Sequence, residues 1–195
     1  MTDAEKFFQR AESLLERLER FIPTFDDIDL SDGIAWRWRK TNHIGHLQKI
    51  DRFNPISLSD LHHIDHQKQE LIRNTRQFLL GLPANNALLW GPRGTGKSSL
   101  VKALLNAYGD GGLKMIEVER QDLVDLPDIV EYLGDSNDKS IVFCDDLSFD
   151  EQDNAYRALK VVLDGSVLST PDNLIIYATS NRRHLVPERL DDNLD

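Results

Sequence analysis

One eight-residue segment restricts the fold of this 195-residue chain more than any other part of it. Residues 91–98 read Gly-Pro-Arg-Gly-Thr-Gly-Lys-Ser and satisfy the spacing G-x-x-x-x-G-K-[ST]. An apolar run precedes this segment and a helical pattern follows it, which is the context that the motif requires. The glycines let the backbone form a nest of N–H donors, and the following helix places its positive end at the same point. We therefore predict a phosphate-binding loop.

The residues of this loop have separate expected tasks. Lys97 is placed to reach the β and γ phosphates of a nucleotide, and Ser98 to coordinate Mg²⁺. The competing interpretation, a glycine-rich turn that matches by chance, is disfavoured by the intact motif and its context. The nucleotide is expected to contact Gly91, Pro92, Arg93, Gly94, Thr95, Gly96, Lys97, Ser98 and Ser99.

A second motif ends in two carboxylates. Residues 141–146 read Ile-Val-Phe-Cys-Asp-Asp, which is typical of a buried parallel strand with acidic residues at its C-terminal end. We assign Asp145 to magnesium and Asp146 to activation of the attacking water, with Asp150 and Glu151 as fallback candidates for the latter. The alternative is a core strand followed by an acidic turn.

A third apolar run, residues 175–178, ends in Thr179, Ser180 and Asn181. A polar side chain at the tip of a strand beside the phosphate loop could bind the attacking water or the γ-phosphate. We choose Asn181 for this role, with Thr179 and Ser180 behind it. A strand followed by a helix N-cap would explain the same residues without any catalytic role.

Short apolar runs alternate with helical segments in the second half of the chain. This order predicts an α/β fold with a parallel sheet and helices on both faces. With the loop at residues 91–98, the expected fold is a three-layer αβα P-loop NTPase. The helices are expected to begin near Gly96, Leu126 and Asp150, and the runs are residues 87–90, 115–118, 141–144 and 174–179.

We divide the chain at residue 55. Residues 1–55 are expected to form an N-terminal helical and irregular extension, and residues 56–195 the nucleotide-binding core. Apolar residues at three- and four-residue spacing over 4–22 predict an amphipathic helix, which either contacts a partner or packs on its own domain. A further capped helix is expected to begin at Ser59-Asp60 and to end near Gly81.

The stretch 56–195 resembles the AAA+ superfamily of P-loop ATPases. More narrowly, residues 85–91, 145–149 and 178–184 resemble the bacterial predicted-ATPase family catalogued as domain of unknown function 815. This resemblance implies an ATP-binding core in which Lys97 is the Walker A lysine, Asp145 and Asp146 are the Walker B acids, and Asn181 is the sensor-1 residue. Many relatives carry Glu at the position of Asp146, and the Asp side chain is one methylene shorter than that of Glu.

The resemblance also concerns segments around this core. AAA+ members normally continue into a C-terminal helical lid with a sensor-2 arginine, whereas this chain ends at Asp195. We therefore expect the lid to be absent, either because the chain is a piece of a longer protein or because the lid is missing. A hexameric ring is implied, and an arginine finger among Arg182, Arg183 and Arg189 is left open. Leu58, Leu61 and Ile64 are expected beside the adenine.

Two further clusters have competing interpretations. Residues 36–40, Trp-Arg-Trp-Arg-Lys, either contact nucleic acid or form a strand whose tryptophans face a core. His62 and His66, four residues apart, either hold a metal or lie on a solvated helix face.

Composition narrows the function classes. The net charge of −10 argues against a general polyanion-binding surface. A single cysteine, Cys144, excludes an internal disulfide and fits a reducing compartment. Without an apolar run of membrane-spanning length or a secretory signal, we expect a soluble cytoplasmic protein with no membrane contact.

Together these patterns predict an ATPase that uses Mg²⁺ to hydrolyse ATP to ADP and phosphate and so remodels an unknown protein partner. Two alternatives remain open at this stage. One is a nucleotide-dependent switch with negligible hydrolysis, and the other is a DNA-associated loader or remodeller.

Overall fold

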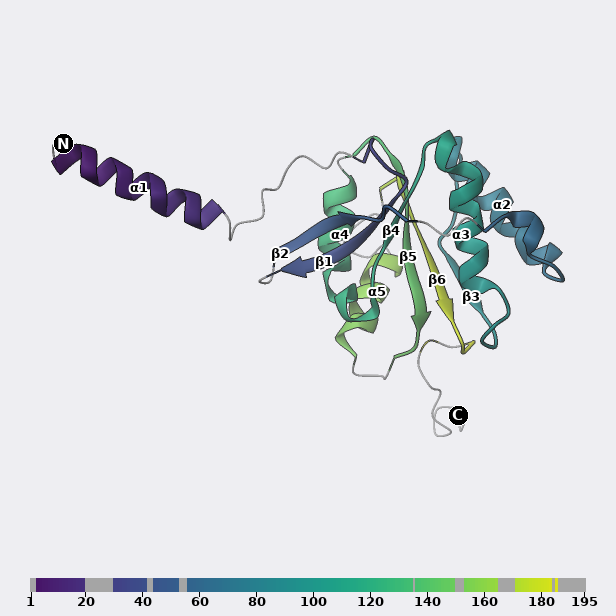
Figure 1. The fold of residues 1–195 in the computed structure, drawn as a ribbon. Helices are drawn as coiled ribbons and strands as arrows, with labels where there is room; N and C mark the ends of the chain where they lie inside the picture. Colours follow the sequence, from purple (N-terminus) through teal and green to yellow (C-terminus); the bar gives the residue numbers. More distant parts are fainter. Residues whose placement is uncertain are drawn as a thin grey trace.

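Our computed structural model describes residues 3–19, 30–41, 44–52, 56–134, 136–149, 153–164, 171–183 and 185. The helices are α1 (Asp3–Glu19), α2 (Asp65–Leu79), α3 (Lys97–Tyr108), α4 (Leu126–Gly134) and α5 (Asn154–Asp164). The strands are β1 (Ala35–Thr41), β2 (Ile44–Lys49), β3 (Ala87–Trp90), β4 (Leu113–Glu117), β5 (Lys139–Leu147) and β6 (Leu174–Ser180). Figure 1 shows their arrangement.

The strands form one six-stranded sheet in the order β2-β1-β4-β5-β6-β3. The pairs β1–β4, β4–β5, β5–β6 and β6–β3 are parallel, and β1–β2 is antiparallel. The predicted α/β class with a mostly parallel sheet is therefore confirmed. Since β6 lies between β5 and β3, the strand of the third motif separates the strands of the first two.

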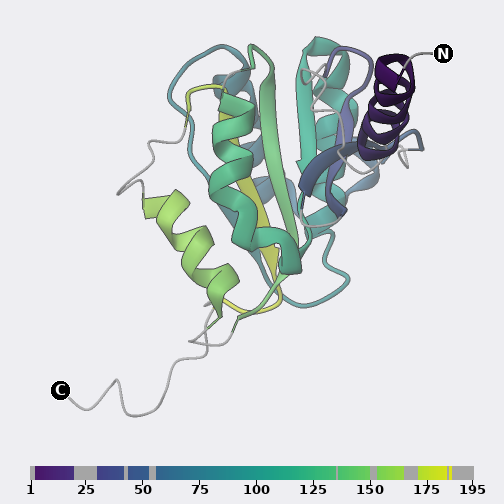
Figure 2. The ribbon, with the colours of Figure 1, turned by 90° about the vertical axis from the view of Figure 1, so that its left-hand side faces the viewer.

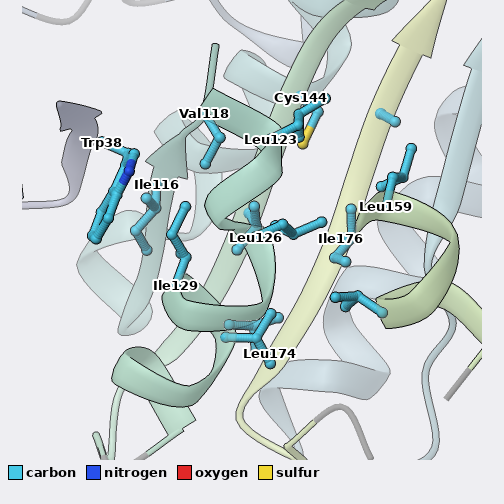
Figure 3. Packing of buried hydrophobic residues seen from close by; sticks show 14 of the residues in the cluster. Trp38, Ile116, Val118, Leu123, Leu126, Ile129, Cys144, Leu159, Leu174 and Ile176 are labelled. Atoms are coloured by element: carbon cyan, nitrogen blue, oxygen red, sulfur yellow. The ribbon is translucent and has the colours of Figure 1, made fainter. Parts of the chain in front are cut away.

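Alternation along the central strands builds two cores, one on each face of the sheet. Ile141 and Phe143 of β5 face α2 and α3, while Val142 and Cys144 face α4 and α5. Figure 2 shows α4 and α5 on one side of the strands. Figure 3 shows the core beneath them, which includes Ile129 of α4 and Leu159 of α5. Both faces are covered, as a parallel sheet requires.

The first strands of the sheet come from the segment that we expected in the N-terminal extension. β1 pairs with β4 in parallel, with Trp36 beside Ile116, so residues 35–49 extend the sheet of the core. Trp36 and Trp38 are buried and pack in the core under α4, because strand alternation points them both to that face. A boundary at residue 55 therefore does not follow the edge of the sheet.

The three cations of residues 36–40 are paired with carboxylates. Arg37 donates to Glu117 at 2.6 Å, Arg39 to Glu119 at 2.7 Å, and Lys40 to Asp125 at 2.6 Å. Asp125 also accepts a hydrogen bond from the Trp38 indole at 3.2 Å. These contacts favour the strand interpretation of residues 36–40 over the nucleic-acid one.

Helix α1 lies apart from the sheet in Figure 1. Its apolar residues Phe7, Phe8, Leu14 and Leu15 are exposed, with Phe7 at 69%. The predicted helix is confirmed, and the side chains described in it do not join either core. None of the helices in the described part of the chain has the length and apolar character needed to cross a membrane.

The helix expected from Ser59 begins six residues later, at Asp65. Residues 58–60 form a short 3-10 turn, in which Ser57 and Asp60 cap each other's backbone N–H groups. His63 then takes a positive φ of 63°, which a helix does not allow. The expectation that His62 and His66 share a helical face is therefore wrong, because His62 precedes the helix.

Candidate active site

The loop between β3 and α3 has the backbone that the first motif predicts. Gly94 and Gly96 have φ values of 79° and 85°, a region that glycine enters without strain. Lys97 begins α3, and its ammonium group donates to the carbonyls of Gly91 at 2.7 Å and Pro92 at 2.8 Å. These two hydrogen bonds stabilise the loop and place the positive charge of Lys97 beside its first two residues.

Ser98 and Asp145 meet across this loop. The Ser98 hydroxyl donates to Asp145 Oδ1 at 2.6 Å, which joins the start of α3 to the end of β5. A hydroxyl and a carboxylate are hard oxygen donors, and Mg²⁺ takes one or two such protein ligands together with phosphate oxygens and water. The donor set of these two residues therefore fits the predicted metal.

A register shift between β5 and β6 directs the two aspartates. Cys144 pairs with Ala178 and Leu147 with Ser180, so Asp145 and Asp146 lie opposite Thr179 alone. In a regular strand, neighbouring side chains would point to opposite faces. Here Asp146 takes a φ of 52°, and both carboxylates reach the same edge of the sheet.

Thr179 holds this shifted register. Its side chain is buried, and its hydroxyl donates to Asp145 Oδ1 at 2.5 Å. The hydroxyl oxygen of Thr179 also accepts the backbone N–H of Asp146 at 2.8 Å. Sequence reasoning considered Thr179 only as a substitute for Asn181. The sequence signal for this role of Thr179, holding the two aspartates in place, is a residue with a hydroxyl group opposite a pair of acidic residues on the neighbouring strand.

Asp146 is contacted on both of its carboxylate oxygens. Asn181 donates its side-chain amide to Oδ1, and Arg93 of the loop donates to Oδ2 at 3.2 Å. Asn181 Oδ1 also lies 3.5 Å from the Lys97 ammonium group. Lys97, Asp146 and Asn181 are thus within one connected group of side chains.

These residues line one cavity of about 330 Å³. The structure therefore brings the three motifs together, although Ser98 and Asp145 are 47 residues apart in the chain and Asp146 and Asn181 are 35 apart. The lining residues are Arg93, Gly94, Thr95, Gly96, Lys97, Ser98, Ser99, Asp145, Asp146, Thr179 and Asn181. Asp150, Glu151 and Arg189, the remaining candidates, lie outside the described residues.

A larger cavity of about 620 Å³ adjoins the loop, between α2 and β3. Ile64, Leu71 and Trp90 contribute to its lining, and it shares Gly91 and Lys97 with the loop. Leu58 and Leu61 pack on the core below α3, so Ile64 alone of the three residues expected near adenine lines this cavity.

Polar contacts fix the wall of the larger cavity. Asn74 of α2 donates to the carbonyl of Asn85 at 2.7 Å and accepts its N–H at 3.0 Å. Asn74 also donates to the Tyr177 hydroxyl at 3.0 Å, which lies 2.9 Å from the Thr75 hydroxyl. Burial raises the pKa of Tyr177 above its ordinary value, so the phenol stays neutral. Helix α2 is in this way tied to the start of β3.

The other candidate residues do not assemble into a second site. His62, His63 and His66 are exposed, and no group of three potential ligands among His, Cys, Asp and Glu occurs in the part of the chain that the structure describes. Arg183 places its guanidinium 5.6 Å above the Trp90 ring.

The chain is similar to one described protein family and, over shorter stretches, to curated proteins. The family described as "Protein of unknown function (DUF815)" matches residues 31–195, which confirms the resemblance expected from the three motifs. The replication factor C large subunit of Staphylothermus marinus is 36% identical over 74 residues, 37% of this chain and 17% of that protein. The corresponding subunit of Sulfolobus acidocaldarius is 35% identical over 86 residues, 44% of this chain and 20% of that protein.

The chain also aligns with solved structures. AMPPCP-bound DnaA from Aquifex aeolicus aligns with a TM-score of 0.49 at 19% identity, over 72% of this chain and 48% of that one. The Thermotoga maritima RuvB Holliday junction branch migration motor aligns with a TM-score of 0.45 at 16% identity, over 70% of this chain and 44% of that one. The chain thus spans less than half of these structures and about a fifth or less of the curated relatives.

Proposed function

The chain belongs to the family described as "Protein of unknown function (DUF815)", and we propose that it binds ATP with Mg²⁺ and hydrolyses it to ADP and phosphate. One observation carries this proposal. A glycine-rich loop, two aspartates and an asparagine from three separate segments line a single cavity at the C-terminal edge of the sheet. This edge is where open parallel sheets bind their ligands.

The loop is suited to phosphate groups. Its backbone N–H groups and the positive end of α3 attract anions, and the Lys97 ammonium group adds a full charge. Ser98 and Asp145 would hold Mg²⁺, which would neutralise charge on the phosphate oxygens during transfer. Thr179 keeps the Asp145 carboxylate directed at Ser98.

The hydrolytic step uses Asp146 and Asn181. A water oxygen forms a bond to the γ phosphorus while the bond from phosphorus to the β–γ bridging oxygen breaks, and the electron pair of that bond leaves with ADP. Asp146 accepts a proton from the attacking water. The Asn181 amide, which contacts Asp146, orients that water. The larger cavity, partly apolar and continuous with the loop, would receive the base and sugar.

The test combines binding and turnover on the same sample. We expect calorimetry to detect ATP binding in the presence of Mg²⁺, and Lys97→Ala to abolish it. Lys160→Ala is the matched control, since Lys160 lies exposed on α5. Asp146→Asn should retain binding and lose phosphate release. Failure of the folded wild-type chain to bind ATP would contradict the proposal.

A switch with negligible hydrolysis is the second candidate function. The observation that favours it is that Arg93 and Asn181 already hold both oxygens of Asp146. Binding without phosphate release at every protein concentration would support the switch. Phosphate release that rises more than linearly with concentration would support an assembling ATPase. The hexameric ring, the protein partner, the DNA-loader alternative and the cytoplasmic location stay predictions.

A further inference from the structure

Arg93 holds a position in the loop that its backbone role does not explain. It is the third residue of the motif, and its side chain extends over the cavity to Asp146, 53 residues further along the chain. Lys97, the other cation of this cavity's lining, is already bonded to the carbonyls of Gly91 and Pro92. Of the two cations that line this cavity, Arg93 is therefore the one that is paired with a side-chain carboxylate.

The ion pair between Arg93 and Asp146 is easily exchanged. The Arg93 side chain is 82% exposed and that of Asp146 is 55% exposed. Ion pairs between exposed groups are weak, because water screens the charges and two long side chains must be ordered. A second anion that reaches the same cavity can thus displace the Asp146 carboxylate from Arg93.

The terminal phosphate of a nucleoside triphosphate is such an anion. It carries more charge than a carboxylate and offers several oxygens to the planar fork of a guanidinium. In the proposed function the phosphate chain would lie along the loop, and its terminal group would then reach the space between Arg93, Lys97 and Asp146. A diphosphate ends one phosphate short of this space.

We propose that Arg93 distinguishes a nucleoside triphosphate from a diphosphate by moving its guanidinium from Asp146 to the terminal phosphate. The exchange also leaves Asp146 Oδ2 open to a water molecule. The inference rests on the proposed function, since it concerns the same nucleotide site. Arg93 would thus recognise the third phosphate and, by the same movement, release Asp146 to act as the base.

The first experiment measures binding to Arg93→Gln. The probes are ADP and a non-hydrolysable ATP analogue, each with Mg²⁺, and dissociation constants come from calorimetry. We expect the analogue to bind about ten- to a hundredfold more weakly than to the wild type, as for the loss of one charge-assisted contact. Binding of ADP should change by less than about twofold. Arg93→Lys should restore part of the loss, because it keeps the charge without the fork.

The matched control is Arg120→Gln. Arg120 donates to Asp153 at 2.6 Å, as Arg93 donates to Asp146, but it does not line either of the two cavities described above. Arg120→Gln removes the same charge from the protein as Arg93→Gln. This variant should bind both probes like the wild type. Equal weakening of ADP and the analogue in Arg93→Gln, or no change in either, would overturn the inference while the proposed function stands. A wild-type chain that binds neither probe would overturn the proposed function and the inference with it.

The second experiment tests the exchange itself with a double-mutant cycle. The substitution Asp146→Asn removes the carboxylate that holds Arg93. The ATP analogue should therefore bind several-fold more tightly to this variant than to the wild type. That gain should disappear when Arg93→Gln is added. The same gain in both backgrounds would mean that Asp146 only repels the phosphate, and would contradict the exchange.

Discussion

The hydroxyl of Thr179 serves both aspartates of the site at once. It donates to Asp145 and accepts from the backbone N–H of Asp146, and the Thr179 side chain itself is buried. Thr179→Val has nearly the same shape but leaves the Asp146 N–H and the Asp145 carboxylate without this partner. We expect it to lose about 1–3 kcal/mol of unfolding free energy in urea.

The same variant should also lose phosphate release, since the positions of both carboxylates depend on the shifted register. Thr179→Ser is the control because it keeps the hydroxyl, and it should retain most of the activity. Wild-type stability and turnover in Thr179→Val would show that the register does not depend on this hydroxyl.

Cys144 precedes Asp145, the proposed magnesium ligand, yet its side chain belongs to the core. Complete burial raises the pKa of its thiol from 9.0 to about 12. In the unfolded chain the thiol loses its proton above about pH 9, while in the folded chain it keeps it. Unfolding free energy is therefore lost from pH 9 to 12, by about 1.4 kcal/mol per pH unit from this group.

Comparison with Cys144→Ala isolates this effect. Urea unfolding at pH 8 and pH 10 should show a smaller alkaline loss of stability in the variant than in the wild type. Equal losses in the two chains would contradict the assigned burial. At pH 8, a thiol reagent should label the wild type only as fast as the protein opens.

The acidic partners of β1 differ in burial, which separates two otherwise similar ion pairs. The side chain of Asp125, the partner of Lys40, is 12% exposed, whereas that of Glu119, the partner of Arg39, is 39% exposed. Lys40→Gln leaves a nearly buried carboxylate without its cation, and Arg39→Gln leaves a hydrated one. We expect a cost above about 1 kcal/mol for the first and below it for the second.

Urea unfolding of the two variants measures both costs. DNA binding at low salt, if the wild type shows any, should not follow these two residues, because each already has a carboxylate partner. Loss of such binding on Arg39→Gln with unchanged stability would restore the nucleic-acid interpretation of this strand.

Helix α1 and strand β1 are neighbours in the chain with opposite roles in stability. The large apolar side chains described in α1 are exposed, while the tryptophans of β1 belong to the core. Deletion of residues 1–22 should therefore leave the unfolding temperature and ATP binding unchanged. Deletion of residues 1–43, which removes β1, should prevent folding. A large drop in unfolding temperature in the shorter deletion would show that α1 packs on the domain.

Across the whole molecule, the sequence predicted the features that repeat or that follow a strict spacing. The loop at residues 91–98, the acids at the end of β5 and the alternation of strands and helices could all be read directly. The place of β1 could not, because a strand of alternating Trp and Arg fits either a sheet edge or a nucleic-acid surface. Its parallel pairing with β4 depends on a contact between residues 80 apart.

The site shows the same division. The residue types of Lys97, Asp145 and Asn181 indicated the roles that we propose for them, because few residue types suit each role. The register shift opposite Thr179 and the reach of Arg93 to Asp146 depend on how two strands and a loop are offset in space. No local pattern in the sequence encodes that offset, so these contacts appeared only in the structure.

The uneven burial of the three tryptophans gives the molecule an optical signal of its own. Trp36 and Trp38 lie in the core and should emit at short wavelength, with little response to added nucleotide. Trp90 is 55% exposed, directly precedes the phosphate loop and lies under the Arg183 guanidinium. Its fluorescence should change in wavelength and intensity as the site fills, so unlabelled protein can be titrated in a cuvette. In Trp90→Phe the residual emission should stay constant throughout the titration.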